Sequence, residues 1–254
     1  MSERVEISVL LPMYNEARRI EHCVDEVEKK VKSFSRSYEI IIAEDGSTDD
    51  TDIIGARLAE MNPRVKFLHS PVRLGKGKAI KKAMCVARGD VIVFLDADLA
   101  TSLEHLLRIA EDVRRHRGMA IGSRYVVGSS VRRPFYRTFF SVAYNLLVRM
   151  FFGDGVRDHQ CGFKAFSHEL AEVLCGKVES NEWFVDTEMI VQAKRLGYAV
   201  TEVGVDWKEL RSNGESKFKL FRDALRTGTE LLKFRLRLYR DVAKTAQKGM
   251  GSTG

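Results

Sequence analysis

The sequence has few of the residues that mark stapled, metal-bound or linker-rich proteins. Its 254 residues include only four cysteines and four prolines. The cysteines, at positions 23, 85, 161 and 175, are far apart and form no C-x-x-C pair, which argues against a zinc site and favours a reduced, cytoplasmic setting. With no internal repeat and no Pro/Gly-rich linker, we expect one fold with an elaborated second half.

Long apolar runs are also missing, which excludes an obvious membrane-spanning helix. The sequence runs straight into an apolar stretch at residues 5–11, and we expect no signal peptide. The most membrane-like segment, 134–152, contains Arg137 and Arg149 and is too polar to span a bilayer comfortably. It can lie on a surface, so we expect peripheral association with the cytoplasmic face of a membrane.

Charge is unbalanced towards the positive. There are 42 Lys and Arg residues against 35 Asp and Glu, a formal net charge of +7. A basic protein of this kind favours an anionic partner, and nucleic acid, phosphorylated small molecules and an anionic membrane all qualify. The hydrophobic fraction of 44% is that of a globular protein with a real core.

What the sequence does contain is organised around residues 89–98. An unbroken run of β-branched and aromatic residues predicts a strand buried on both faces, and it ends in Asp96 and Asp98. Carboxylates two residues apart on an extended strand point the same way and repel unless a cation lies between them. Hard oxygen ligands suit Mg²⁺ or Mn²⁺. The alternative is that both acids cap the next helix, where residues 101–104 form a capping box.

Strand and helix patterns alternate over residues 5–117. Strands are predicted at 5–11, 38–43, 65–69 and 89–95, and helical patterns follow each of them. Asn15 is expected to cap the first helix, and the second is expected to turn Ile53, Ile54, Leu58 and Met61 inward. The alternation implies an α/β fold with a mainly parallel central sheet flanked by helices. The turns that follow three of the strands should then meet at one carboxyl edge, where nucleotides bind.

Beyond residue 118 the pattern is looser. We expect strands at 119–125, 162–166 and 198–207, and helices at 132–152, 182–196 and 217–239. The chain is predicted to divide into a catalytic domain at 1–217, basic amphipathic helices at 218–246 and a disordered tail at 247–254. Within the domain, the two halves cover about 1–125 and 126–217.

Single motifs leave two interpretations open. The Gly75-Lys76-Gly77-Lys78 turn lacks the Walker spacing, but it could hold phosphate at a helix start or simply make a tight turn. Asp45 could bind a nucleobase or ribose, or only form a turn. A third motif is the basic cluster of Arg124, Arg132, Arg133 and Arg137, interleaved with aromatic residues. It could bind a lipid phosphate or be a solvated face. The 207–217 loop could be a lid or an ordinary connection.

Taken together, these motifs resemble the family-2 glycosyltransferases of the GT-A fold. Within that family they are similar to the polyprenyl-phosphate sugar synthases, which include dolichyl-phosphate mannose synthase and dolichyl-phosphate glucosyltransferase. The resemblance runs in order over residues 5–218. It is carried by VLLPMYNE (9–16), EDGSTD (44–49), LGKG (74–77), DAD (96–98), GSR (122–124), DHQCGFK (158–164), WFVDTE (183–188) and the segment 211–217.

The resemblance implies that residues 1–125 form a donor half and residues 126–217 an acceptor half, and it implies a role for individual positions. Donor binding falls to Pro12, Tyr14, Glu16, Asp45, Lys76, Asp96, Ala97, Asp98, Arg211 and Lys217. Among these, Asp96 and Asp98 would hold Mg²⁺ or Mn²⁺, and Asp98, Arg211 and Lys217 would be catalytic. The acceptor's phosphate would meet Arg124, Arg137 and Ser141. Sugar hydroxyls would meet Gln160, Asp186 and Glu188. The mannose synthases carry a further metal ligand, a Gln, at the position filled here by Ala100.

The implied reaction is transfer of a hexose from a nucleotide-sugar to a polyprenyl (dolichyl) phosphate, with inversion at the anomeric carbon. The 160–164 segment is closer to the glucosyl members, so UDP-glucose is expected before GDP-mannose. The alternative is a glycosyltransferase with a soluble saccharide or polysaccharide acceptor, which would need Asp186 as a base. More remote alternatives are a non-catalytic sugar-nucleotide-binding protein and a nucleic-acid-binding protein.

Overall fold

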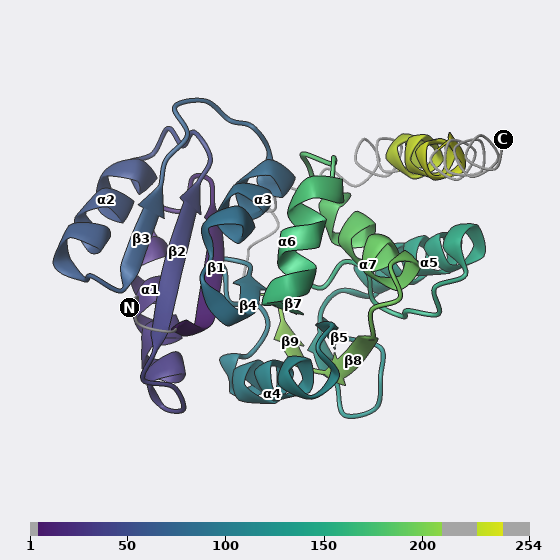
Figure 1. The fold of residues 1–254 in the computed structure, drawn as a ribbon, viewed down its shortest axis with the longest axis horizontal. Helices are drawn as coiled ribbons and strands as arrows, with labels where there is room; N and C mark the ends of the chain where they lie inside the picture. Colours follow the sequence, from purple (N-terminus) through teal and green to yellow (C-terminus); the bar gives the residue numbers. More distant parts are fainter. Residues whose placement is uncertain (1–4, 210–227, 241–254) are drawn as a thin grey trace, which may run out of the picture.

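A computed structural model describes residues 5–209 and 228–240. Its centre is a seven-stranded sheet in the order β3-β2-β1-β4-β7-β5-β8, with helices on both faces (Figure 1). The α/β class with a mainly parallel sheet is confirmed.

The first four strands form a parallel block, as the alternation of patterns predicts. They are β1 (Val5–Met13), β2 (Tyr38–Glu44), β3 (Val65–Leu68) and β4 (Gly89–Leu95). All seven residues of β2 are buried, because helices cover both faces of a parallel sheet and leave no side of the strand in water. β1 lies between β2 and β4, so the carboxyl ends of these three strands meet at one edge.

The second half of the sheet is mixed. β5 (Met119–Ser123) and β8 (Val200–Gly204) are parallel to each other, while β7 (Phe163–Ser167) runs antiparallel between β4 and β5. Two short strands, β6 (Ser130–Arg132) and β9 (Asp206–Lys208), pair outside the main sheet. The single strand predicted at 198–207 is therefore two strands, β8 and β9.

Two helical layers enclose the sheet. Contact with one face is made by α1 (Ile20–Lys32), α2 (Thr51–Met61) and α4 (Leu106–His116), the last preceded by the short 3₁₀ helix η1 (Leu103–His105). The other face is covered by α3 (Lys76–Val86), α6 (His168–Lys177) and α7 (Val185–Arg195). α5 (Phe135–Phe152) packs instead with α7 and the helical segment 228–240 through a separate apolar cluster (Figure 1).

Two predictions about helices are wrong, and one helix was missed. Asn15 is not a cap, because α1 begins at Ile20, and the Asn15 side chain accepts from the Thr48 backbone in the neighbouring loop. Ile53 and Met61 are exposed, and only Ile54 and Leu58 of the predicted set pack on the core. The ten-residue helix α6 was not predicted, although Ser167 caps it.

The basic helix predicted at 217–239 is confirmed over 228–240, where the structure describes it. The rest of that prediction, and the predicted tail at 247–254, lie outside the described residues. Within the described ranges, no helix combines the length and apolar character needed to cross a membrane.

Candidate active site

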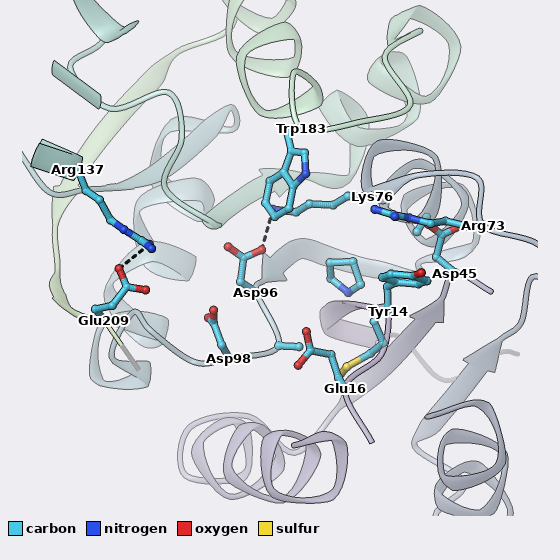
Figure 2. A pocket seen from close by; sticks show the side chains of 14 residues that line it. Tyr14, Glu16, Asp45, Arg73, Lys76, Asp96, Asp98, Arg137, Trp183 and Glu209 are labelled. Atoms are coloured by element: carbon cyan, nitrogen blue, oxygen red, sulfur yellow. Dashed lines mark hydrogen bonds and ion pairs between the residues drawn. The ribbon is translucent and has the colours of Figure 1, made fainter. Parts of the chain in front are cut away.

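A cleft opens at the edge where β1, β2 and β4 end, and Figure 2 shows the side chains that line it. Nine predicted site residues lie there together: Pro12, Tyr14, Glu16, Asp45, Lys76, Asp96, Ala97, Asp98 and Arg137. They come from five separate parts of the chain. The parallel topology therefore gathers most of the predicted donor site in one place.

The acidic doublet follows β4 in a tight turn rather than capping a helix. Asp98 Oδ1 accepts from the Ala100 N–H, 3.1 Å away, and the Leu99 N–H donates to the Asp96 carbonyl. The cap of η1 is Ser102, whose side chain accepts from Glu104 N–H. Gly162 lies directly against Asp96, where an added Cβ would be 1.7 Å from Asp96 Oδ2. The doublet therefore faces the cleft, and the predicted alternative of helix capping is wrong.

Lysine side chains link the carboxylates beneath the cleft. Lys76 Nζ lies 2.7 Å from Asp96 Oδ1 and 3.6 Å from Asp186 Oδ2, and Lys164 Nζ lies 2.5 Å from Asp186 Oδ1. The Lys76 ammonium also sits 4.6 Å from the centre of the Trp183 ring. Burial raises the pKa of Asp96, Lys76 opposes that rise, and the charges of Asp98 and Asp186 add to it. The cluster thus holds more negative charge than Lys76 alone neutralises.

The chemistry of the donor set fits a hard divalent cation. Asp96 and Asp98 offer carboxylate oxygens, which Mg²⁺ and Mn²⁺ prefer, and Mg²⁺ in particular is commonly held by one or two carboxylates plus substrate phosphates and water. No group of three or more His, Cys, Asp or Glu side chains suited to a metal occurs in the described part of the chain. A metal here would therefore depend on the diphosphate of a bound ligand to complete its shell.

The opposite end of the cleft suits a nucleoside. The Arg73 guanidinium stacks 4.2 Å from the centre of the Tyr14 ring, which makes a flat wall (Figure 2). Asp45 lines the cleft, and its two carboxylate oxygens accept from the N–H groups of Leu74 and Gly75 at 2.7 and 2.8 Å. Both proposed roles of Asp45 are thus compatible with its position, because it shapes the turn and still borders the cleft.

The three predicted acceptor-phosphate residues have different partners. Arg137 lines the cleft, where its Nη1 lies 2.8 Å from Glu209 Oε2. Ser141 is buried and donates to Gln160 Oε1 at 3.4 Å. Arg124 is connected to Ser141 through Asp158 and Gln160, and its side chain is only 7% exposed.

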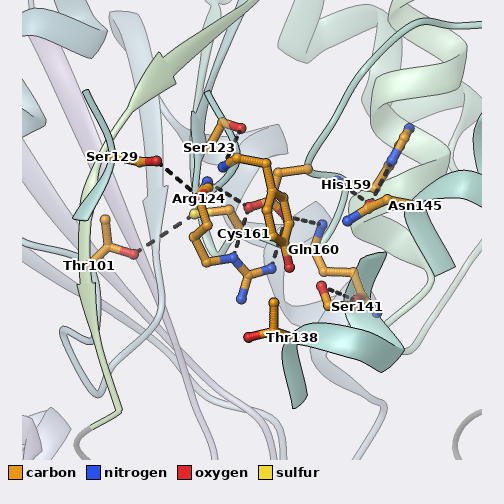
Figure 3. Close-up of polar contacts among 12 residues, drawn as sticks. Thr101, Ser123, Arg124, Ser129, Thr138, Ser141, Asn145, His159, Gln160 and Cys161 are labelled. Carbon is orange, nitrogen blue, oxygen red and sulfur yellow. Dashed lines mark hydrogen bonds and ion pairs between the residues drawn. The ribbon is translucent and has the colours of Figure 1, made fainter. Parts of the chain in front are cut away.

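Arg124 is paired with a buried carboxylate (Figure 3). Its Nε and Nη2 donate to the two Asp158 oxygens, each at 2.8 Å, and its backbone N–H donates to Asp158 Oδ2 as well. Burial alone would raise the pKa of Asp158, but the Arg124 guanidinium holds it below its ordinary value. Asp158 Oδ1 also accepts from the Gln160 N–H. This geometry gives Arg124 a structural role and does not favour the predicted contact with phosphate.

The predicted sugar-binding residues Asp186 and Glu188 differ in their contacts. Asp186 contacts Lys76 at the base of the cleft. Glu188 is 1% exposed, and its carboxylate accepts from the Glu179 and Ser180 N–H groups and from Arg237. It is therefore committed to holding the backbone, and the prediction that it binds sugar hydroxyls is not supported. Arg211 and Lys217 lie outside the described residues.

Five residues that line the cleft were not assigned from the sequence: the apolar Met13 and Ala79, and Arg73, Trp183 and Glu209. Trp183 opens the WFVDTE motif, so its position in that motif was the available signal. Arg73 and Glu209 gave none, because their contacts with Tyr14 and Arg137 join distant parts of the chain.

Comparisons with known proteins show the family of the chain. Residues 8–174 match the family described as Glycosyl transferase family 2. The chain is 46% identical to glycosyltransferase AglD of Haloferax volcanii over 90% of its own length, and it spans 37% of that protein. It is 31% identical to the dolichyl-phosphate beta-glucosyltransferase of Homo sapiens, with 91% of this chain and 75% of that protein covered.

Solved structures share the fold. Glucosyl-3-phosphoglycerate synthase from Mycobacterium tuberculosis in complex with UDP aligns with a TM-score of 0.67 at 21% identity, covering 91% of this chain and 80% of that one. The mannosyltransferase PcManGT from Pyrobaculum calidifontis in complex with GDP-Man and Mn²⁺ aligns with a TM-score of 0.57 at 21% identity, covering 84% and 59%. The predicted GT-A fold is thereby confirmed.

Proposed function

The chain belongs to glycosyl transferase family 2 and is a glycosyltransferase, and from that premise we propose that it transfers a hexose from a nucleotide-sugar to a polyprenyl phosphate. The observation that carries the proposal is the single cleft that brings a flat nucleoside wall, an acidic doublet and a basic side chain, Arg137, together. Relatives named dolichyl-phosphate beta-glucosyltransferase, covered over about three quarters of their length, support the same acceptor class.

We propose UDP-glucose as the donor, with GDP-mannose second. The nucleoside would lie between Tyr14 and Asp45, with Pro12, Glu16 and Ala97 lining the same cleft. The glucosyl relatives and the QCGFK segment at 160–164 favour glucose. The diphosphate would then lie over Lys76 at the start of α3, where a helix N-terminus also favours negative charge.

Asp96 and Asp98 are proposed to hold Mg²⁺ or Mn²⁺, which when bound neutralises charge on the departing diphosphate. Lys76 is placed to contribute in the same way, because its ammonium stands between Asp96 and Asp186. Arg211 and Lys217 are proposed to supply further positive charge, as the family resemblance implies. This is electrostatic stabilisation of a leaving group, so its effect should be on turnover.

A phosphate acceptor makes a dedicated general base unnecessary. The second pKa of a phosphate monoester is about 6, so the attacking oxygen is largely ionised at neutral pH. Asp186 is bound by Lys164 and lies near Lys76, which suits an anchoring role better than proton removal. Direct attack by the phosphate on the anomeric carbon would invert its configuration. Arg137 is proposed to bind the acceptor's phosphate, with Glu209 as its partner until the acceptor arrives.

The acceptor's lipid implies contact with a membrane surface. Exposed apolar side chains gather on α5 and on the neighbouring helix 228–240, and we call these side chains the apolar face. They are Phe135, Tyr136, Phe139, Phe140, Val142, Leu146, Leu147, Met150, Leu232, Leu236 and Tyr239. A patch of this kind with flanking arginines suits an interfacial helix pair on an anionic bilayer. We propose peripheral binding to the cytoplasmic face through it.

One assay tests the proposal. Radiolabelled UDP-glucose and GDP-mannose are each incubated with the protein and Mg²⁺ or Mn²⁺, with and without dolichyl phosphate. We expect lipid-extractable label from UDP-glucose only when dolichyl phosphate and a divalent cation are both present, and we expect EDTA to abolish it. An α-linked product would contradict direct inversion, because UDP-glucose carries an α linkage.

Other outcomes would favour the competing functions. Label on a soluble saccharide without lipid would support the soluble-acceptor alternative, with Asp186 as base. Nucleotide-sugar binding without release of nucleotide would indicate a binding protein. Nucleic-acid binding would account for the net positive charge but not for paired carboxylates at a strand end, so it is the more remote alternative.

A further inference from the structure

The loop that joins α6 to α7 rests directly on the start of α3. The Asn181 carbonyl accepts from the N–H groups of Gly77 and Lys78 at 2.9 and 3.4 Å. An added Cβ at Gly75 would lie 2.2 Å from the Asn181 carbonyl oxygen, and one at Gly77 would lie 2.4 Å from that of Ser180. The loop backbone therefore fixes the turn that carries Lys76. Trp183, from the same loop, covers the Lys76 ammonium (Figure 2).

The same loop is held from its other side by one buried carboxylate. Glu188 Oε1 accepts from the Glu179 N–H at 3.0 Å, and Oε2 accepts from the Ser180 N–H at 2.8 Å. The N–H groups of two consecutive residues thus donate to a side chain that is almost fully buried. The position of residues 179–181 depends on where Glu188 stands.

Helix 228–240 supplies the countercharge to Glu188. Arg237 reaches from this helix to Glu188 Oε1, and its Nη1 also lies 2.6 Å from Glu179 Oε2. Apolar packing holds this helix in place, with the Phe234 ring centre 5.6 Å from that of Phe184 and 5.3 Å from that of Phe152. A carboxylate this deeply buried is costly without a paired cation.

We propose that Arg237 is a positioning residue for the donor site. It holds Glu188, Glu188 holds the 179–181 backbone, and that backbone fixes the Gly75–Gly77 turn and Lys76. The side of helix 228–240 away from Arg237 carries Leu232, Leu236 and Tyr239 of the apolar face. The helix thereby connects the apolar face to the nucleotide pocket. The effect on catalysis rests on the proposed donor site, whereas the structural coupling does not.

The test compares three variants of the full chain by amide hydrogen exchange and steady-state kinetics. Arg237→Gln removes the ion pair, and Arg237→Lys keeps the charge. Lys233→Gln is the matched control, because Lys233 is 73% exposed and pairs only within its own helix, with Glu230, among the ion pairs described.

In Arg237→Gln we expect exchange at the Glu179, Ser180, Gly77 and Lys78 amides to accelerate by roughly tenfold, the size expected for losing one charged hydrogen bond. The KM for the nucleotide-sugar should rise about fivefold or more, with the KM for the lipid acceptor within about twofold. Arg237→Lys should lie between this variant and the wild type. Lys233→Gln should match the wild type in both measurements.

A second variant distinguishes loss of the ion pair from unfolding of helix 228–240. Glu188→Gln removes the pair from the other side, and the double variant with Arg237→Gln should be no worse than the more affected single one. Unchanged exchange at Gly77 and Lys78 in Arg237→Gln, or additive effects in the double variant, would overturn the coupling. Accelerated exchange in a chain that binds no nucleotide-sugar would uphold the coupling and refute the donor site instead.

Discussion

At the scale of single residues, Asp98 gives the sharpest test of the acidic doublet. Asp98→Asn keeps the size of the side chain and removes its charge, so it should lower turnover by roughly 10²–10³-fold, as loss of one group that stabilises developing charge does. The measurement is kcat at saturating UDP-glucose and Mn²⁺. Asp90→Asn is the matched control, because Asp90 is exposed at the other end of the same strand. Comparable loss in both variants would contradict the assignment.

Gly162 tests how closely the chain must approach Asp96. A Cβ there would overlap Asp96 Oδ2, so Gly162→Ala should push the carboxylate aside and lower both Mn²⁺ affinity and turnover. Gly176, near the end of α6, has open space around its Cβ position. Gly176→Ala should therefore leave turnover unchanged and add about 0.5–1 kcal/mol to the free energy of unfolding. Normal Mn²⁺ binding by Gly162→Ala would show that Asp96 tolerates displacement.

The buried pair of Arg124 and Asp158 should matter for stability. Asp158→Asn leaves a buried guanidinium without its countercharge, so it should cost about 3–5 kcal/mol in the free energy of unfolding. Asp25→Asn, which breaks an exposed pair with Lys29, should cost less than about 1 kcal/mol. Urea unfolding at pH 7 measures both. Equal costs would mean that the Asp158 pair is not the buried contact described.

The same pair has a predictable pH dependence. The folded pKa of Asp158 lies below its ordinary value of 3.8, so the ionised pair stabilises the fold fully above that value. The stabilisation should be lost as the pH falls below 3.8 towards the folded pKa. The difference between wild type and Asp158→Asn should accordingly be constant from about pH 5 to 7 and shrink below pH 4. A difference that grows on acidification would contradict the sign.

At the scale of elements, periodicity predicts the parallel block well and misses what depends on distant contacts. The apolar runs that form β1, β2 and β4 can be recognised in the sequence. Asn15 looks like a helix cap, but its side chain accepts from the Thr48 N–H, and the Glu16 N–H donates to Thr51 at the start of α2, both more than thirty residues away. α6 is only ten residues long, so its pattern does not stand out until Ser167 is recognised as its cap.

The apolar face of α5 yields a prediction for this scale. Phe135 and Phe139 are 83% and 61% exposed, and burying each in a bilayer interface is worth about 1.5–3 kcal/mol. Replacing both with Ser should reduce binding to vesicles containing anionic lipid by at least about tenfold, measured by co-sedimentation. Met61→Ser, an exposed apolar residue on α2, should bind like the wild type. Unchanged binding of the double variant would place the membrane contact elsewhere.

At the scale of the whole molecule, the two halves of the site differ in how far the sequence predicts them. The donor half follows from topology, because the ends of β1, β2 and β4 must meet once those strands are parallel neighbours. The acceptor half depends on pairings that cross the chain. Arg124 meets Asp158, Arg137 meets Glu209 and Glu188 meets Arg237, and no local pattern specifies any of these. Motif resemblance placed Arg124 and Glu188 at a ligand, whereas the fold commits both to buried contacts.

The most direct test of the central claim is diffraction from crystals grown with UDP-glucose and Mn²⁺, using the anomalous signal of manganese to locate the metal. The account predicts one strong anomalous peak within coordination distance of Asp96 or Asp98 and of the diphosphate, with the uracil ring at the Tyr14 and Asp45 end of the cleft. Manganese and nucleotide bound away from the β4 carboxyl end, with the two aspartates still facing an open cleft, would contradict it.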